Sequence, residues 1–144
     1  MEESETFLIN HILSDNNARL LTFGPNSYLN MGNEIAVKTG TTNDKRDNWT
    51  VGWNRRGIVG VWVGNNDNSP MNPTLASGIS GAAPIWNKIM NNLLAKQNPS
   101  EEKYTPPKNI VIKPCGGKNE YFIKGTENRV LCRPISLVEQ KPNP

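Results

Sequence analysis

Residues 36–49 read A-V-K-T-G-T-T-N-D-K-R-D-N-W, and the pattern around this stretch decides the expected fold. Residues 34–38 alternate between two faces, which predicts a strand. Residues 49–53 (W-T-V-G-W) alternate as a second strand, and the mostly apolar residues 57–64 predict a third strand that is buried on both faces. The links between them are short, with a turn at residues 55–57, so we expect an antiparallel meander.

Two helices are expected on either side of this meander. Residues 4–15 predict the first, with Ser4 as its N-cap. Residues 82–94 repeat apolar side chains at intervals of three and four and predict the second, with Ser80 as its cap. Residues 14–33 are dense in Asn, Asp, Gly and Pro, which indicates a loop. The fold class is therefore α/β (α+β), with three antiparallel strands and flanking helices.

The chain divides into three parts by composition. Residues 1–95 carry the meander and its helices, residues 96–108 are polar and Pro-rich and predict a linker, and residues 109–144 form a small extension. Residues 109–112 and 120–123 predict short strands, so the extension is expected to be β-rich.

The only two cysteines, Cys115 and Cys132, bracket the middle of this extension. Two cysteines cannot make a structural zinc site by themselves, and the single histidine, His11, is far away in sequence. They either pair or remain two free thiols. An extension of this size rarely holds a core without a staple. We therefore expect a disulfide in an oxidising compartment, worth about 3 kcal/mol by the loop-entropy model.

The composition excludes several functions. The formal net charge of +3 is mild, and no Arg/Lys stripe with interleaved aromatics is present, so nucleic-acid binding is not expected. No metal or cofactor is expected. The longest apolar run, residues 58–63, is too short to span a bilayer, and no signal-peptide pattern opens the chain. Any targeting segment or membrane anchor is expected upstream of Met1.

Lys38-Thr39-Gly40 and the residues after it resemble the transpeptidase domain of class A penicillin-binding proteins. The resemblance covers residues 5–95 well and residues 109–135 more loosely, and it is carried by K-T-G-T-T-N-D-K-R-D-N-W-T-V-G-W-N, G-I-V-G-V-W-V-G-N-N-D-N and S-G-I-S-G-A-A-P-I-W-N-K-I-M. Trp53 stands where tyrosine is usual. I-L-S-D-N-N-A-R, F-G-P-N-S-Y-L-N and the Cys-bounded tail are similar to 1C-type members.

The family has two further motifs, Ser-x-x-Lys with the nucleophile and Ser-x-Asn. Ser100-Glu101-Glu102-Lys103 matches the first literally, but it follows Lys-Thr-Gly in the linker and its carboxylates would keep the lysine protonated. Ser14-Asp15-Asn16 matches the second literally, but it lies too close to Lys38 and reads as a helix end running into a loop. The resemblance therefore places the nucleophilic serine outside this chain, upstream or on a companion chain, with a glycosyltransferase domain and membrane anchor.

The resemblance implies acyl transfer from a D-Ala-D-Ala stem peptide of peptidoglycan, with β-lactams as mimics, on the outer face of the bacterial cytoplasmic membrane. Lys38 would place positive charge near the substrate carboxylate, and Gly40 would let the substrate backbone approach. The N–H of Thr41 would serve the oxyanion hole. The hydroxyls of Thr39 and Thr41 are candidates to bind the carboxylate. A regular strand points Lys38 and Gly40 to one face and Thr39 and Thr41 to the other, so some local twist is expected.

The other aromatic and charged residues have structural interpretations. We expect all four tryptophans in the core, and Asp44, Arg46 and Asp47 as braces of the turn after Lys-Thr-Gly. Alone, the chain should leave a sheet edge and an apolar face uncovered, so we expect it to be stable only with its N-terminal complement and to be inactive by itself. The alternatives are a non-catalytic binding module with a vestigial cleft, and a transpeptidase-like β-lactam sensor.

Overall fold

The structure is a computed structural model that describes residues 1–31, 35–96 and 104–132. It divides into two compact units, which we call the sheet unit (Ile9–Tyr104) and the tail unit (Met1–Leu8 with Thr105–Pro144). The first eight residues thus group with the C-terminal extension, a division that composition does not signal. In the described part of the chain, no helix has the length and apolar character needed to cross a membrane.

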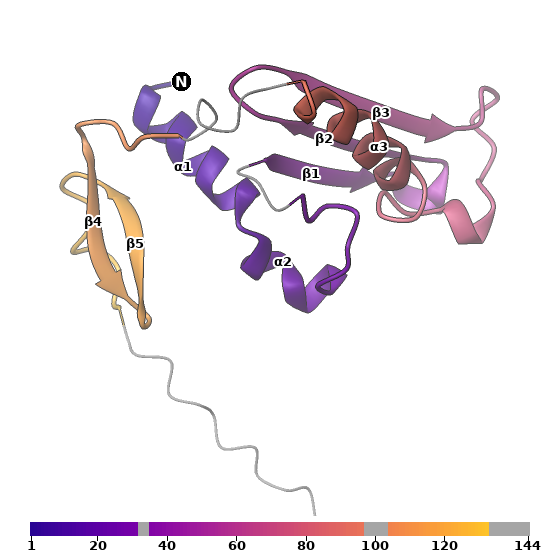
Figure 1. Ribbon diagram of the computed structural model, residues 1–144. Coiled ribbons are helices and arrows are strands. Elements are labelled where there is room, and N and C mark those ends of the chain that lie inside the picture. The colour runs from indigo at the N-terminus through magenta and orange to yellow at the C-terminus, as the bar shows by residue number, and fades with distance from the viewer. Residues whose placement is uncertain (32–34, 97–103, 133–144) are drawn as a thin grey trace, which may run out of the picture. The chain divides into compact units, whose positions relative to one another are not determined.

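The sheet unit contains the expected antiparallel meander, in the order β1 (Ala36–Thr41), β2 (Asp47–Trp53) and β3 (Ile58–Gly64) (Figure 1). The prediction that the third strand is buried on both faces is wrong. Of its residues only Val61 is buried, and Ile58 is 70% exposed. β3 is an edge strand of the described sheet, and the described helices leave part of its surface uncovered.

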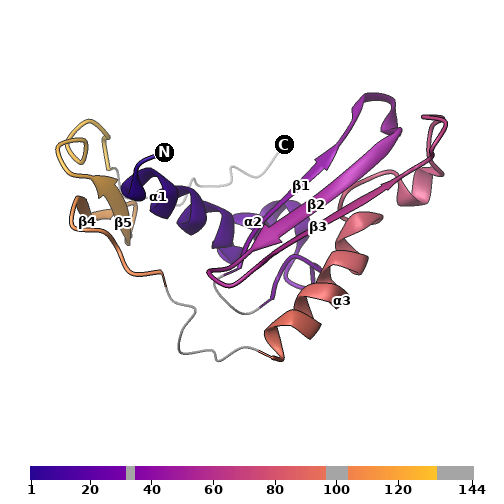
Figure 2. The same cartoon turned by 90° about the horizontal axis from the view of Figure 1, so that it is seen from above.

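One face of the sheet is covered by α3 (Ala82–Leu94) (Figures 1 and 2). Trp86 and Met90 are fully buried in a core cluster that includes apolar side chains of β1 and β3. Gly52 makes room for the indole, because a Cβ at that position would lie 2.3 Å from Trp86 Cζ2. The prediction that all four tryptophans are core is wrong for Trp49 and Trp62, which are 46% and 41% exposed on the opposite face.

α3 is capped from the sheet, so the predicted cap by Ser80 is wrong. The N-cap residue is Gly81, which has no side chain to offer. Instead Asn48 of β2, fully buried, accepts the Ala82 N–H at Oδ1 (2.9 Å) and donates from Nδ2 to the Leu75 carbonyl (2.8 Å). Leu75 closes a short 3-10 helix, η2 (Pro73–Leu75). Asn48 thereby joins the start of α3 to the central strand.

The expected loop over residues 14–33 contains a helix, so that prediction is wrong in part. α1 (Glu3–Ser14) is followed directly by α2 (Asn16–Phe23). Asp15 caps α2, since its Oδ1 accepts the N–H groups of Asn17 and Ala18. Ser4 is not the cap of α1 but lies inside it.

Within the sheet unit, the second half of α1 is tied to the sheet. Asn10 Oδ1 accepts the indole N–H of Trp53 at 2.6 Å. Asn10 is buried, so this bond satisfies a polar group that would otherwise be costly to place there.

The tail unit is built on a hairpin of β4 (Ile110–Cys115) and β5 (Lys118–Ile123). Gly116 and Gly117, both with positive φ, form the two-residue turn. The predicted disulfide between Cys115 and Cys132 is present. Phe7 packs edge-on against Tyr121 with ring centroids 5.2 Å apart. Residues 97–103 of the predicted linker lie outside the described residues.

Candidate functional site

The Lys38-Thr39-Gly40-Thr41 segment forms most of β1, which lies at one edge of the described sheet. The N–H of Thr42 bonds across to the Asp47 carbonyl at 3.1 Å. Because backbone groups alternate in direction along a strand, the N–H of Thr41 points the other way, toward the free edge. Lys38 Nζ donates to the Thr39 carbonyl at 2.6 Å, which fits the same alternation. The edge therefore presents backbone N–H and C=O groups beside an ammonium.

The side chains of β1 divide between the two faces as the pleat requires. Thr39 and Thr41 lie on the face covered by α3 and the segment before it, since both approach Gly78. Lys38 and Gly40 lie on the other face and are exposed. The structure thus brings all four predicted residues onto one strand, while their roles toward a ligand stay predictions.

Gly40 is not required by packing. A Cβ placed there would meet only Trp49 Cβ, at 3.9 Å, which is an ordinary contact. Its φ lies outside the left-handed region. Nothing in the described structure therefore demands a glycine at this position, which leaves close approach of a ligand backbone as a physical reason for it.

The turn after the strand is braced by the acidic and basic residues that the sequence assigned to it. It contains the short 3-10 helix η1 (Asn43–Lys45), in which Asp44 has φ 60°. Arg46 Nη1 donates to the Asn68 carbonyl, and Asp47 Oδ2 accepts the indole N–H of Trp62 at 3.0 Å. These contacts hold the end of β1 in place.

The segment Ser14-Asp15-Asn16 lies where α1 ends and α2 begins. The Ser14 hydroxyl donates to the His11 carbonyl of its own helix at 3.1 Å, and Asp15 caps α2. Its match to Ser-x-Asn is therefore explained by local structure. Ser100-Glu101-Glu102-Lys103 lies outside the described residues.

A hollow of about 180 Å³ adjoins β1 within the sheet unit, and the sequence did not signal it. It is walled mainly by apolar side chains, with Arg19 and Lys38 as its charged members, and its lining is Ile12, Leu13, Arg19, Phe23, Leu29, Val37, Lys38 and Thr39. Arg19 donates weakly to the Leu29 carbonyl at 3.4 Å. Its Nε and Nη2 are buried with no partner among the described residues. Burial lowers the pKa of Arg19, and the nearby Asp15 carboxylate opposes this.

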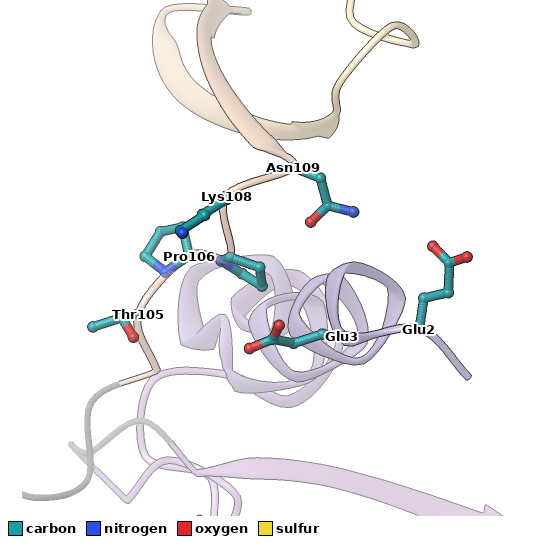
Figure 3. A pocket seen from close by; sticks show the side chains of 7 residues that line it. Glu2, Glu3, Thr105, Pro106, Lys108 and Asn109 are labelled. Carbon is teal, nitrogen blue, oxygen red and sulfur yellow. The ribbon is translucent and has the colours of Figure 1, made fainter.

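The tail unit has a hollow of its own, of about 520 Å³ (Figure 3). Figure 3 shows Glu2 and Glu3 at the start of α1 beside the extended segment that leads into β4. The lining is Glu2, Glu3, Thr105, Pro106, Pro107, Lys108 and Asn109. Asn109 Nδ2 donates to the Ser4 hydroxyl at 2.9 Å and closes one side. Within residues 1–31, 35–96 and 104–132, no group of three or more His, Cys, Asp or Glu side chains is placed to hold a metal ion.

The comparisons with known proteins point to one kind of relative. No protein-family profile matches the chain. It is 33% identical to penicillin-binding protein 1A of Aquifex aeolicus over 115 residues, which covers 72% of this chain and 16% of the relative. It is 32% identical to penicillin-binding protein 1C of Escherichia coli over 96 residues, covering 67% and 12%. Penicillin-binding protein 1B of Vibrio cholerae is 47% identical over 66 residues, covering 44% and 8%.

A solved structure agrees with these relatives. The crystal structure of penicillin-binding protein 1A from Haemophilus influenzae superposes with a TM-score of 0.55 at 31% identity, covering 65% of this chain and 15% of that one. The homologues of this chain are therefore class A penicillin-binding proteins. Types 1A, 1B and 1C are all among them, so the expected 1C subtype is not singled out. The chain spans 16% or less of the length of these relatives.

Proposed function

We propose that this chain is the C-terminal part of the transpeptidase domain of a peptidoglycan synthase, and that it supplies the Lys-Thr-Gly wall of the active site. The observation that carries the proposal is the geometry of β1. Its free edge presents the outward N–H of Thr41 and the exposed Lys38 side chain, next to a glycine that packing does not require. The similarity to penicillin-binding proteins supports the same assignment.

The reaction is acyl transfer through a serine that another part of the protein, or a companion chain, supplies. The serine oxygen forms a bond to the penultimate D-Ala carbonyl carbon of a stem peptide. The amide bond to the terminal D-Ala then breaks, and that D-Ala leaves as an amine after taking a proton. An amine from a second peptidoglycan strand attacks the acyl-enzyme, forms the new amide and frees the serine.

The residues of the wall have separate parts in this scheme, and Thr41 has two. The N–H of Thr41 donates to the oxygen that becomes negative as the serine adds, a type of contact worth about 3 kcal/mol in the transition state. Lys38 places a positive charge near the terminal carboxylate of the substrate. Thr39 and Thr41 donate hydroxyl hydrogen bonds to that carboxylate. β-Lactams carry a carboxylate at the corresponding position and stop the reaction at the acyl-enzyme. The protein would work on the outer face of the cytoplasmic membrane.

The proposal is tested by intact-mass spectrometry of the full-length protein with benzylpenicillin. One penicillin adduct is expected, on a serine outside residues 1–144. An adduct on a serine of this segment, or no adduct at all, would contradict the proposal. An adduct together with no release of D-Ala from a stem pentapeptide would favour the β-lactam sensor instead.

Two substitutions of Thr41 separate the contribution of its backbone N–H to acylation from that of its side chain. Thr41→Pro removes the N–H, and an edge strand tolerates proline where the N–H faces outward. Thr41→Val removes only the hydroxyl and is the matched control. Acylation by penicillin should fall about 100-fold or more in Thr41→Pro, well below Thr41→Val. Equal rates in the two variants would remove Thr41 from the oxyanion hole.

A further inference from the structure

The backbone of Gly78 is held by threonine hydroxyls from two neighbouring strands. Thr50 of β2 donates from Oγ1 to the Gly78 carbonyl at 3.1 Å, and Thr50 is fully buried. The Gly78 N–H donates to Oγ1 of Thr41 at 3.1 Å. The buried Thr50 hydroxyl is therefore connected through Gly78 to the Thr41 hydroxyl on the proposed active-site wall.

Gly78 lies directly against the wall, with no spare room. A Cβ on this residue would lie 2.9 Å from Thr39 Cβ and 2.9 Å from the Trp49 carbonyl oxygen. Both neighbours belong to the paired strands, so neither can move as the end of a flexible side chain would. Gly78 also lies within a turn, in which the Ser80 N–H donates to the Ser77 carbonyl at 3.1 Å. The position of Gly78 is thus set by the sheet and by its own turn.

In each of these two hydrogen bonds the donor and the acceptor are fixed. The Thr50 proton is directed at the Gly78 carbonyl, and Thr41 uses one oxygen lone pair to accept the Gly78 N–H. The Thr41 proton has no acceptor among the described residues, and Thr41 is exposed. Its O–H is therefore free to rotate toward a ligand.

We propose that Thr50 and Gly78 are positioning residues that make the Thr41 hydroxyl a donor for the ligand carboxylate. Thr50 holds Gly78 through its carbonyl, and the Gly78 N–H takes one oxygen lone pair of Thr41, so that the Thr41 proton is left for the ligand. This inference rests on the proposed function and adds two residues outside the Lys-Thr-Gly motif to it. Neither residue touches the substrate, so they act through Thr41.

The test compares two ligands on the full-length protein. Acylation rate constants are measured with benzylpenicillin, which carries a carboxylate, and with its methyl ester, which does not. Thr50→Val keeps the shape of the side chain and removes its donor. Val61→Ala is the control for stability, since Val61 is paired with Thr50 across β2 and β3 and belongs to the hydrophobic core cluster. Melting temperatures are recorded for every variant.

The preference for the acid over the ester should fall about tenfold in Thr50→Val, the scale of one hydrogen bond to a charged group. Thr50→Ser should restore it to within about twofold, because the hydroxyl returns. Val61→Ala should lower the melting temperature and leave the preference unchanged. In a Thr41→Val background, Thr50→Val should have no further effect on the preference, since no hydroxyl remains to be oriented.

The following results would overturn the inference. An unchanged preference in Thr50→Val, with wild-type acylation intact, would refute it and leave the proposed function standing. Equal loss of preference in Thr50→Val and Val61→Ala would show that Thr50 acts only through stability. A wild-type protein that is not acylated at all would remove the proposed function, and this inference with it. If Thr50→Val does not fold, Thr50→Cys replaces it as a variant with a weaker donor of similar size. Thr50→Cys should give a preference between those of wild type and Thr41→Val, and a wild-type preference would refute the inference.

Discussion

Removal of the disulfide between Cys115 and Cys132 should open the tail hairpin while leaving the sheet unit unchanged. The hairpin of β4 and β5 has little else to hold it, because a two-stranded hairpin is marginal in water. Among the described residues of the tail unit, the buried apolar side chains are Phe7 and Ile110. A core of this size does not compensate for the loss of a covalent link.

The expected magnitude follows from the length of the closed loop. The two cysteines are 17 residues apart in sequence, and the loop-entropy model assigns such a link about 3 kcal/mol. At about 1.4 kcal/mol for each factor of ten, the opening equilibrium of the hairpin should rise roughly 150-fold. The sheet unit contains no cysteine, so its own opening should not change.

Amide hydrogen exchange followed by mass spectrometry measures both units in one sample. The paired amides of β4 and β5 should exchange roughly 150-fold faster in the Cys115→Ser/Cys132→Ser variant, since exchange from local opening follows the opening free energy. Amides of the central strand β2 are the internal control. Unchanged exchange in the hairpin would refute the reasoning and show that packing alone holds the tail unit. Faster exchange in β2 as well would show that the two units unfold together.

The remaining predictions concern the sheet unit and are measured on the full-length protein. Asn48→Ala should lower the free energy of unfolding by about 3 kcal/mol, because it leaves the buried Ala82 N–H and the part-buried Leu75 carbonyl without partners. Denaturant unfolding measures this, and a loss below about 1 kcal/mol would contradict it. Trp86→Ala should cost about 3–5 kcal/mol but Trp86→Phe only about 1 kcal/mol, since the buried indole N–H has no partner among the described residues and little polar bonding is lost. Denaturant unfolding measures both stability costs, and equal costs for Trp86→Ala and Trp86→Phe would contradict this prediction. The Ser69 hydroxyl and N–H donate to the Asp67 carboxylate and lower its pKa below the usual 3.8. The stabilising contribution of this carboxylate is therefore present above pH 3.8 and is lost as the pH falls through the lowered pKa, and an NMR titration that finds a pKa of 3.8 or higher would contradict it.

Local patterns were sufficient for several elements. Alternation along residues 49–53 and the three-four spacing along residues 82–94 predicted β2 and α3, because each pattern reflects the geometry of its own backbone. The disulfide was predictable because the chain has only two cysteines. α2 was missed although its signals are local. Asp15 caps its start and Gly24, with φ 73°, follows its end, but the surrounding density of Asn and Gly indicated a loop.

The contacts that complete the candidate site depend on residues far apart in sequence. Asn48 caps a helix that begins 34 residues later, and Gly78 meets a threonine 37 residues before it. No local pattern encodes such pairs, because they form only when the segment before α3 is laid against β1 and β2. The exposure of β3 has the same origin, since the burial of a strand depends on which elements cover it. The sequence by itself determined the strands, the second long helix and the motif on β1; only the tertiary structure decided how that motif is supported.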